Sequence, residues 1–166
     1  MSFRKLLLVT LLIPGLSLAA EEPHKFTPQA GFGGDSEGNG TLKLVLGRTQ
    51  AFHVVSRGTV QGDGSFRLEQ RIAFAGKPPQ DRVWILTTAS PGHYSGRLSD
   101  ASGPVTGFTS GSRLSLRYRL KGPLVMHQQL QLMPDGKIID NVGVITVLGM
   151  PVGRLHETIE RRSRAP

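Results

Sequence analysis

The 166-residue sequence contains no cysteine, so no disulfide bond can form, whatever the redox state of the compartment. The fold must therefore be stabilised by packing and by backbone hydrogen bonds alone. A cysteine nucleophile is excluded for the same reason. We also expect no lipid anchor, because an anchor of the kind that joins an N-terminal cysteine has no residue to attach to.

Recognisable catalytic and metal-binding motifs are also lacking. The sequence has no G-x-S-x-G, no H-E-x-x-H and no phosphate-binding G-K-[ST] element. Asp35-x-Glu37 and Asp140-Asn141 carry oxygen ligands, but a calcium loop needs more of them in a fixed order. The histidines are too scattered for a metal site and occupy positions 24, 53, 93, 127 and 156. We therefore expect a protein that is not an enzyme and that uses no metal and no cofactor.

Hydrophobic runs long enough to cross a bilayer are absent too. The apolar run near the N-terminus, residues 6–13, is far shorter than the roughly 20 residues of a spanning helix. Arg4 and Lys5 precede it, and Ser17-Leu18-Ala19 offers small residues where a signal peptidase cleaves. This layout predicts a cleaved signal peptide over residues 1–20 and export to the periplasm. A buried N-terminal helix is the alternative.

Acidic residues are fewer than basic ones, 12 against 20, and the formal net charge is +8. A basic cytoplasmic domain would suggest nucleic acid as a partner, but the predicted signal peptide argues against that partner. Outside the cytoplasm, the anionic surfaces are lipid headgroups, lipopolysaccharide and cell-wall polymers. A basic face would either contact such a surface or simply favour solubility.

Glycine is abundant, and apolar side chains alternate with polar ones along much of the chain. In residues 65–74, for example, Phe66, Leu68 and Ile72 would share one face of a strand. Turn signals rich in Gly, Pro and Asp separate such segments. Strands are expected over residues 41–47, 50–61, 65–75, 81–89, 93–100, 105–111, 112–121, 124–133, 137–147 and 152–162, with a short helix as the alternative within 144–161.

Consecutive strands with no helix between them form an antiparallel meander, and so long a meander must close or fold over to protect its edges. We therefore predict an all-β fold, a single antiparallel up-and-down (lipocalin-like) β-barrel of about eight to ten strands over residues 41–163. A β-sandwich is the alternative. Residues 21–40, which are rich in Gly, Pro and polar side chains, are expected to form an extended lead-in.

A glycine-rich stretch lies over residues 91–111, with several glycines four positions apart. Residues four apart in a strand share a face, so such glycines leave part of that face bare. A bare position lets a strand coil at a barrel corner, or lets a neighbouring ring lie across the backbone. The barrel interior is then either filled by rings or open as a ligand cavity. For an open cavity, the expected ligand-binding residues are Trp84, Tyr94, Phe108 and Tyr118 in the wall and Arg82 near a rim.

Many small sequence elements follow one another in an order that is typical of one family. They are Gly58, Leu68-Glu69, a turn at 74–76, Arg82-x-Trp84, Pro91-Gly92-x-Tyr94-x-Gly96, Asp100-x-x-Gly103, Gly107-x-x-x-Gly111, Tyr118-x-Leu120, Asn141 and Gly149-x-x-x-Gly153. Over residues 30–162 the sequence resembles a family of bacterial envelope proteins, many of them lipoproteins, classed as domain of unknown function 3833. The resemblance implies an envelope location and a single β-rich domain with no assigned activity.

The sequence departs from the pattern of that family in three places, one of which is Gln70, where members often have Glu. The family commonly has an acidic pair followed by Trp where this chain reads Met-His-Gln-Gln over residues 126–129. Members often begin with a lipidated cysteine, which is absent here. If the acidic pair has a role elsewhere in the family, we do not expect this chain to share it.

The sequence favours a non-catalytic role, in which the barrel would bind a small apolar or amphiphilic, lipid-like molecule inside. A second hypothesis is a structural or assembly protein that contacts an anionic envelope surface or a protein partner. Its basic outer face would consist of Arg113, Arg117 and Arg119, joined by Arg154, Arg161 and Arg162. A third hypothesis is an enzyme, for which only His127, Gln70 and Asp100 are inner-strand candidates, and alternation places His127 on the outer face.

Overall fold

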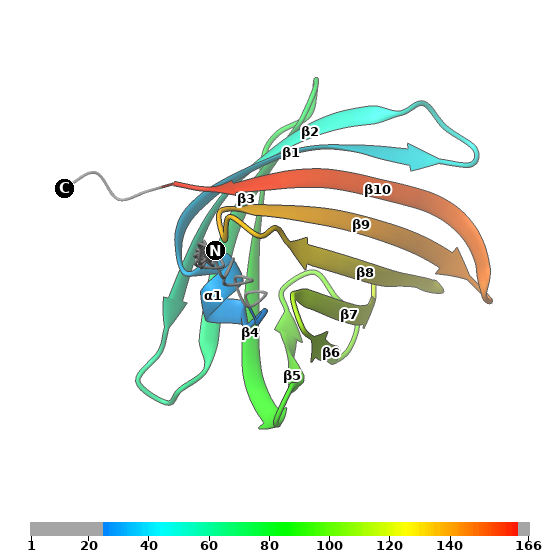
Figure 1. Ribbon diagram of the computed structural model, residues 1–166. Helices are drawn as coiled ribbons and strands as arrows, with labels where there is room; N and C mark the ends of the chain where they lie inside the picture. Colours follow the sequence, from blue (N-terminus) through cyan, green and yellow to red (C-terminus); the bar gives the residue numbers. More distant parts are fainter. Residues whose placement is uncertain (1–24, 163–166) are drawn as a thin grey trace, which may run out of the picture.

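Alternating side chains build one curved sheet in the computed structural model, which describes residues 25–162. Ten strands and one short helix make up this part of the chain (Figure 1). Their bounds are α1 (Pro28–Phe32), β1 (Gly34–Leu44), β2 (Gln50–Val60), β3 (Phe66–Phe74), β4 (Gln80–Ser90), β5 (His93–Leu98), β6 (Val105–Ser110), β7 (Arg113–Arg119), β8 (Leu124–Leu132), β9 (Ile138–Val147) and β10 (Met150–Arg161). The predicted signal peptide, residues 1–20, lies outside the described residues.

Each strand is hydrogen-bonded to its neighbours in sequence, and β1 also pairs with β10, which closes the sheet into a barrel. In this closing pair, Leu42 of β1 lies opposite Leu155 of β10, and the pairing is antiparallel. Closure satisfies the backbone groups that two edge strands would leave unpaired. The predicted antiparallel up-and-down barrel is confirmed, and the sandwich is excluded. The alternative helix within 144–161 is not formed, because β9 and β10 occupy that segment.

Strand alternation places the apolar side chains inside the barrel. On β7, Leu114, Leu116 and Tyr118 are buried, whereas Arg113, Arg117 and Arg119 are exposed. The neighbouring strands β6 and β8 alternate in the same way. The buried side chains of eight strands and α1 join into one core. Removing this apolar surface from water is the main stabilising contribution to the fold.

Part of the predicted lead-in, residues 21–40, forms the helix α1 rather than extended chain. The helix begins after Thr27, whose Oγ1 accepts a hydrogen bond from the backbone N of Ala30 at 3.0 Å. Pro28 follows at the first helical position, where its fixed φ suits the helix and its missing N–H costs nothing. The helix is only five residues long and ends with Phe32, which is buried.

The barrel also starts earlier than predicted, because β1 begins at Gly34 and not at residue 41. Two of the inward positions of β1 are Gly38 and Gly40, so the strand lacks the apolar alternation that would mark it in the sequence. Both glycines are needed for space. A Cβ on Gly40 would lie 2.5 Å from the ring of Phe52, which comes from the next strand.

The helix α1 closes one end of the barrel (Figure 1). The rings of Phe26 and Phe32 are buried there, edge to face, with centroids 6.0 Å apart. The backbone of Phe26 also donates to the carbonyl of Gly111 at 2.8 Å. At the opposite end, which we call the mouth, the chain turns between β1 and β2, β3 and β4, β5 and β6, β7 and β8, and β9 and β10.

The glycines of residues 91–111 have two different roles. Gly96 and Gly107 lie within strands against close neighbours: a Cβ on Gly96 would lie 2.0 Å from the carbonyl O of Ile85, and one on Gly107 3.0 Å from the side chain of Leu116. For these two glycines the prediction is correct: the missing side chain leaves a bare position that a neighbouring residue covers. The other three glycines lie between strands, two of them with a positive φ, and serve as turn residues.

Candidate functional site

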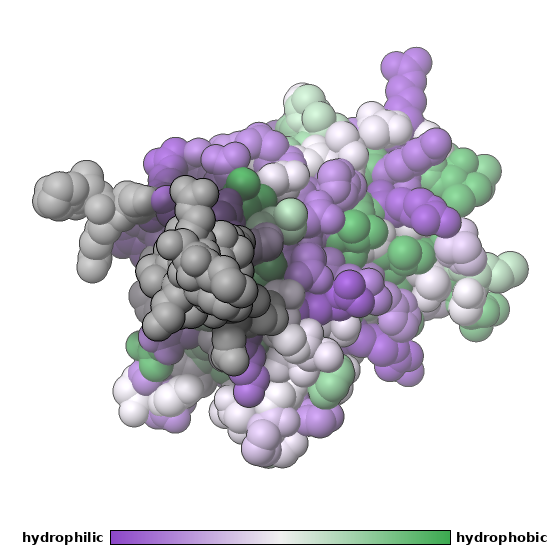
Figure 2. Space-filling model, viewed as in Figure 1, coloured by the Kyte–Doolittle hydropathy of each residue, from purple (hydrophilic) through white to green (hydrophobic). Residues whose placement is uncertain are grey.

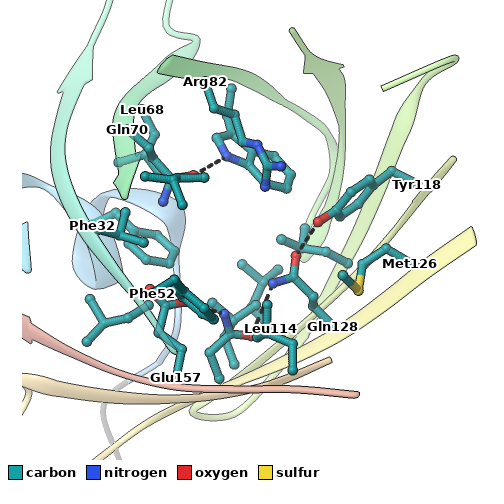
Figure 3. Close-up of a pocket in the computed structure, with 18 of the residues that line it drawn as sticks. Phe32, Phe52, Leu68, Gln70, Arg82, Leu114, Tyr118, Met126, Gln128 and Glu157 are labelled. Carbon is teal, nitrogen blue, oxygen red and sulfur yellow. Dashed lines mark hydrogen bonds between the residues drawn. The ribbon is translucent and has the colours of Figure 1, made fainter. Parts of the chain in front are cut away.

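A cavity of about 160 Å³ lies inside the barrel (Figure 3). Its wall extends from Phe32, the last residue of α1, to Phe74 and Leu120, near the mouth. Most of the wall is apolar, because the inward positions of the surrounding strands carry aliphatic and aromatic side chains. Polar contacts are confined to a few side chains. This combination suits a small ligand with an apolar body and a polar group.

A chain of four buried polar side chains crosses one wall of the cavity. The Tyr118 hydroxyl donates to Gln128 Oε1 at 2.8 Å, and Gln128 Nε2 donates to Asn141 Oδ1 at 3.3 Å. Asn141 Nδ2 in turn donates to Glu157 Oε2 at 2.8 Å. The four residues come from the adjacent strands β7, β8, β9 and β10 and are each less than a tenth exposed. Such a network positions its members firmly, because each buried polar group satisfies the next.

Glu157 ends this chain, and its carboxyl group is almost completely buried. Burial raises the pKa of Glu157 above its ordinary value, although the hydrogen bond from Asn141 and the charge of Arg82 act in the opposite direction. Space for the carboxyl comes from Gly38, where a Cβ would lie 2.1 Å from Glu157 Oε1. The group can accept a hydrogen bond when ionised and donate one when protonated.

Tyr118 stands at the other end of the chain and remains a neutral hydrogen-bond donor. Burial raises the pKa of its phenol, and the nearby carboxyl groups of Asp100 and Glu157 add to the rise. Its ring packs edge to face on Trp84, with centroids 5.1 Å apart. Both ends of the polar chain are therefore fixed by neighbours.

A second cluster of polar side chains lies on another wall of the cavity, where Figure 3 shows Gln70 and Arg82. Trp84 Nε1 donates to Gln70 Oε1 at 2.7 Å, and Gln70 Nε2 donates to Ser56 Oγ at 3.3 Å. Gln70 and Arg82 are register partners on β3 and β4. The indole N–H is thus satisfied inside the barrel, which fixes the orientation of the ring.

Arg82 is held at the cavity wall by Asp100, which lies between β5 and β6 at the mouth. Its Nε and Nη2 donate to the same oxygen, Asp100 Oδ2, at 3.0 and 2.6 Å. The Arg82 side chain is 22% exposed, so the guanidinium is reachable from water while it lines the cavity. No described hydrogen bond within residues 25–162 uses Nη1 of this guanidinium.

Three of the five predicted ligand-binding residues, Arg82, Trp84 and Tyr118, line the cavity. Tyr94 points inward but packs against the core beside Gly107, outside the cavity wall. The predicted position of Phe108 is wrong: it is 47% exposed on the outer face, with its ring 4.9 Å from that of His93. Because Gly107 faces inward, its neighbour Phe108 must face outward.

Gln128, Asn141 and Glu157 were not among the predicted site residues. Each occupies an inward position in a run of alternating residues, as Glu157 does between Leu155 and Ile159. That alternation was the one signal that could have identified them. A polar residue at an inward position must find partners inside the barrel, so it indicates an internal network.

The residues suggested for an enzyme do not form one site. His127 is exposed on the outside of β8. Gln70 is engaged with Trp84, and Asp100 with Arg82. Within residues 25–162, no three His, Asp or Glu side chains are grouped so that they could hold a metal ion.

The predicted basic face is smaller than the sequence suggested. Arg113, Arg117 and Arg119 do point outward from β7. Arg161, in contrast, donates to the carbonyls of Ala30 and Gly33 and so ties the last strand to α1. Arg162, another residue of the predicted basic face, forms an ion pair with Glu37.

A family model described as a protein of unknown function, DUF3833, matches residues 6–161. The chain belongs to the DUF3833 family. The resemblance inferred from the short sequence elements is thereby confirmed. No curated protein matches this DUF3833 chain. In the described part of the chain, no helix has the length and apolar character that a membrane crossing requires.

Solved structures that share the barrel include the following two proteins. The S-type phycobiliprotein lyase CPES from Guillardia theta superposes with a TM-score of 0.67 at 8% identity, over 83% of this chain and 92% of that one. A protein of unknown function of the DUF3598 family from Nostoc punctiforme gives 0.63 at 14% identity, over 89% of this chain and 53% of that one. The DUF3833 chain thus spans about half of the latter protein. At such low identity these likenesses show the lipocalin-like fold.

Proposed function

We propose that this DUF3833 protein binds one small amphiphilic molecule inside its barrel and has no catalytic role. The observation that carries the proposal is the cavity of about 160 Å³, whose apolar wall is interrupted by two separate polar groups. An apolar cavity of about 150 Å³ in another protein stays dry and takes up benzene. The apolar part of the ligand is therefore about the size of one ring or a short branched chain. A longer chain would extend through the mouth.

The ligand's apolar body would contact Phe52, Leu116 and Met126, which line the cavity. Its polar end would lie near Arg82, because this guanidinium is partly exposed at the cavity wall and keeps Nη1 free of described hydrogen bonds. The carboxyl of Glu157 offers a second, deeper contact to a hydroxyl or amino group. The phycobiliprotein lyase supports the choice of fold only; the proposal stands on these side chains.

Substitution of Leu116 by Phe tests this function. The larger ring would occupy the cavity, whereas Ser115→Phe places the same ring on the outer side of β7 and is the matched control. We expect organic extraction and mass spectrometry of the purified wild-type protein to recover a small amphiphile in near-stoichiometric amount. Leu116→Phe should lower its amount about tenfold or more, in keeping with the steep cost of overfilling a packed interior, and Ser115→Phe should not.

Two outcomes would contradict the proposal. One is a wild-type protein that carries no ligand and takes up none from a mixture of short-chain alcohols and fatty acids. The other is equal ligand content in Leu116→Phe and Ser115→Phe, since binding would then lie elsewhere. Circular dichroism of both variants shows whether the barrel is intact.

We also propose that the protein acts outside the cytoplasm, in the periplasm. The support is the charged, apolar and small-residue layout of residues 1–20. Cell fractionation and N-terminal sequencing should find the protein in the periplasmic fraction, beginning after Ala19 or Ala20. A cytoplasmic protein that keeps Arg4 and Lys5 would contradict this part of the proposal.

A further inference from the structure

The most exposed large hydrophobic side chains of the described residues are gathered at two turns. Leu46 is 99% exposed, Leu148 88%, Val45 70% and Met150 64%, whereas every other exposed large hydrophobic lies between 39 and 51%. Val45 and Leu46 belong to the turn between β1 and β2. Leu148 belongs to the turn between β9 and β10, and Met150 is the first residue of β10. Single exposed aliphatic residues are ordinary, but four of them on two neighbouring turns form a feature of the surface.

The two turns are neighbours in the barrel, because β1 pairs with β10. The backbone N of Val45 donates to the carbonyl of Val152 at 2.9 Å, which joins the first turn to the start of β10. Both turns protrude at the mouth, at the right of Figure 1, away from α1. Figure 2 shows hydrophobic surface at the same two places, with hydrophilic surface beside it. We call residues 45–46 and 148–150 the apolar tips.

Other turns of the same barrel have the usual polar composition. Gly62-Asp63-Gly64 joins β2 to β3, and Pro134-Asp135-Gly136 joins β8 to β9. Leu148 also has φ of +50°, and within residues 25–162 it is the one non-glycine residue with a positive φ. Gly or Asn normally occupies such a position in a two-residue hairpin turn. An exposed leucine there stabilises nothing in the fold, which points to a contact outside the molecule.

Basic side chains surround the apolar tips. Lys43 and Arg154 are register partners on the outside of β1 and β10, and Arg48 lies in the first turn. None of the ion pairs formed within the described chain involves these three residues. At the α1 end, in contrast, carboxylates are frequent and several are paired with arginine, as in Arg57–Asp35. The mouth also has carboxylates, Asp81 and Asp100, but each is paired with an arginine, so Lys43, Arg48 and Arg154 leave the mouth basic.

We propose that the apolar tips dock the mouth of the barrel on an anionic lipid bilayer. Aliphatic side chains flanked by Lys and Arg match the boundary between acyl chains and anionic headgroups. The tips are two separate protrusions and not a groove, so each can enter a fluid surface independently. This inference goes beyond ligand binding and is independent of it. Where both hold, the docked cavity would open toward lipid.

The absence of cysteine permits a direct test with a single labelled site. Leu46→Cys is labelled with the environment-sensitive fluorophore NBD, and Val60→Cys is the control, 51% exposed in the native residue and near the α1 end. Vesicles contain equal parts of phosphatidylglycerol and phosphatidylcholine, or phosphatidylcholine alone. We expect a blue shift and brighter emission at position 46 with anionic vesicles at low salt, little change with neutral vesicles, and none at position 60.

A second variant replaces the most exposed residue of each apolar tip without disturbing either turn. Asn tolerates a positive φ, so Leu46→Ser combined with Leu148→Asn should fold at least as well as the wild type. Its affinity in vesicle co-sedimentation should fall about tenfold or more, because the apolar part of the interfacial contact is lost. Val60→Ser should bind like the wild type. Lys43→Gln with Arg154→Gln should weaken binding and flatten its dependence on salt.

Three results would overturn the proposal. The first is a wild-type protein that does not bind anionic vesicles. The second is equal vesicle affinity in the wild type and the Leu46→Ser, Leu148→Asn variant. The third is a label at position 46 that responds to protein concentration and not to vesicles, which would make the tips an interface between two copies. Ligand content is measured in the same samples, so failure here is distinguishable from failure of the cavity proposal.

Discussion

At the scale of single residues, Glu157 is a buried carboxyl group in the cavity wall. Its carboxyl is buried, receives one hydrogen bond from Asn141 and fits only because Gly38 has no side chain. Burial disfavours the ionised form, and the partners compensate in part. A carboxyl in such a place destabilises the fold when it ionises, and the proposed ligand contact would offset part of that cost.

The raised pKa makes the contribution of Glu157 to stability depend on pH. Below the ordinary value of 4.5 the carboxyl is protonated in both the folded and the unfolded chain. As pH rises above it, the unfolded chain releases the proton first, so the free energy of unfolding falls until the folded pKa is passed. The Glu157→Gln variant should lack this pH-dependent fall in the free energy of unfolding. The difference between variant and wild type in urea unfolding should therefore shift in favour of the variant from acidic to neutral pH.

A matched control for this measurement is Glu160→Gln, which changes an exposed carboxyl on the same strand. Its difference from the wild type should stay nearly constant over the same pH range. A Glu157→Gln difference that is flat with pH, or that falls, would show that burial does not raise the pKa of Glu157.

At the scale of elements, glycines decide where strands approach one another. Gly96 lies on β5, where a Cβ would lie 2.0 Å from the carbonyl of Ile85 on β4. Gly103, in the same glycine-rich stretch, has nothing within 4 Å of its Cβ position and no positive φ. The same residue type therefore serves close packing in one place and a turn in the other.

Alanine substitutions should separate these two roles. Gly96→Ala should lower the free energy of unfolding by about 2 kcal/mol or more, because the backbone of β4 must shift. Gly103→Ala should change it by no more than about 0.5 kcal/mol. Urea unfolding followed by Trp84 fluorescence measures both. Equal effects of the two substitutions would contradict the assigned close contact.

Most strands could be predicted because each carries its own alternation. The expected strand 65–75 is β3 (Phe66–Phe74), and the expected strand 124–133 is β8 (Leu124–Leu132). β1 could not be recognised in full, because Gly38 and Gly40 replace its inward apolar residues. The atoms that fill their places come from β2, the next strand, and from β10, at the other end of the chain. Contacts of that kind are not encoded in any local pattern.

The candidate site was predicted in part for a related reason. Aromatic residues such as Trp84 and Tyr118 stand out in a sequence with only one Trp and two Tyr. Glu157 and Asn141 do not stand out, because Asp, Glu and Asn are usually on the surface or in turns. Phe108 was misplaced although the start of β6 at Val105 was predicted correctly, because alternation from Val105 gives the inward position to Gly107 and the outward one to Phe108.

At the scale of the whole molecule, the barrel has two unlike ends. The α1 end is closed by Phe26 and Phe32 and carries paired charges. The mouth carries the apolar tips, with Lys43 and Arg154 beside them. The turns lie at two ends because, in one up-and-down sheet that closes on itself, successive turns alternate between opposite ends. Under the proposed function, a ligand would enter the cavity from the mouth.

The fluorescence of Trp84 tests the central claim, a ligand cavity inside the barrel, most directly. Trp84 is the single tryptophan, is 5% exposed and lines the cavity, so a bromine atom quenches it efficiently only from within. Titration with short-chain brominated alcohols should give saturable quenching in the wild type and in Ser115→Phe, and little in Leu116→Phe. Quenching that rises linearly, without saturation and equally in all three proteins, would contradict a binding cavity in the barrel.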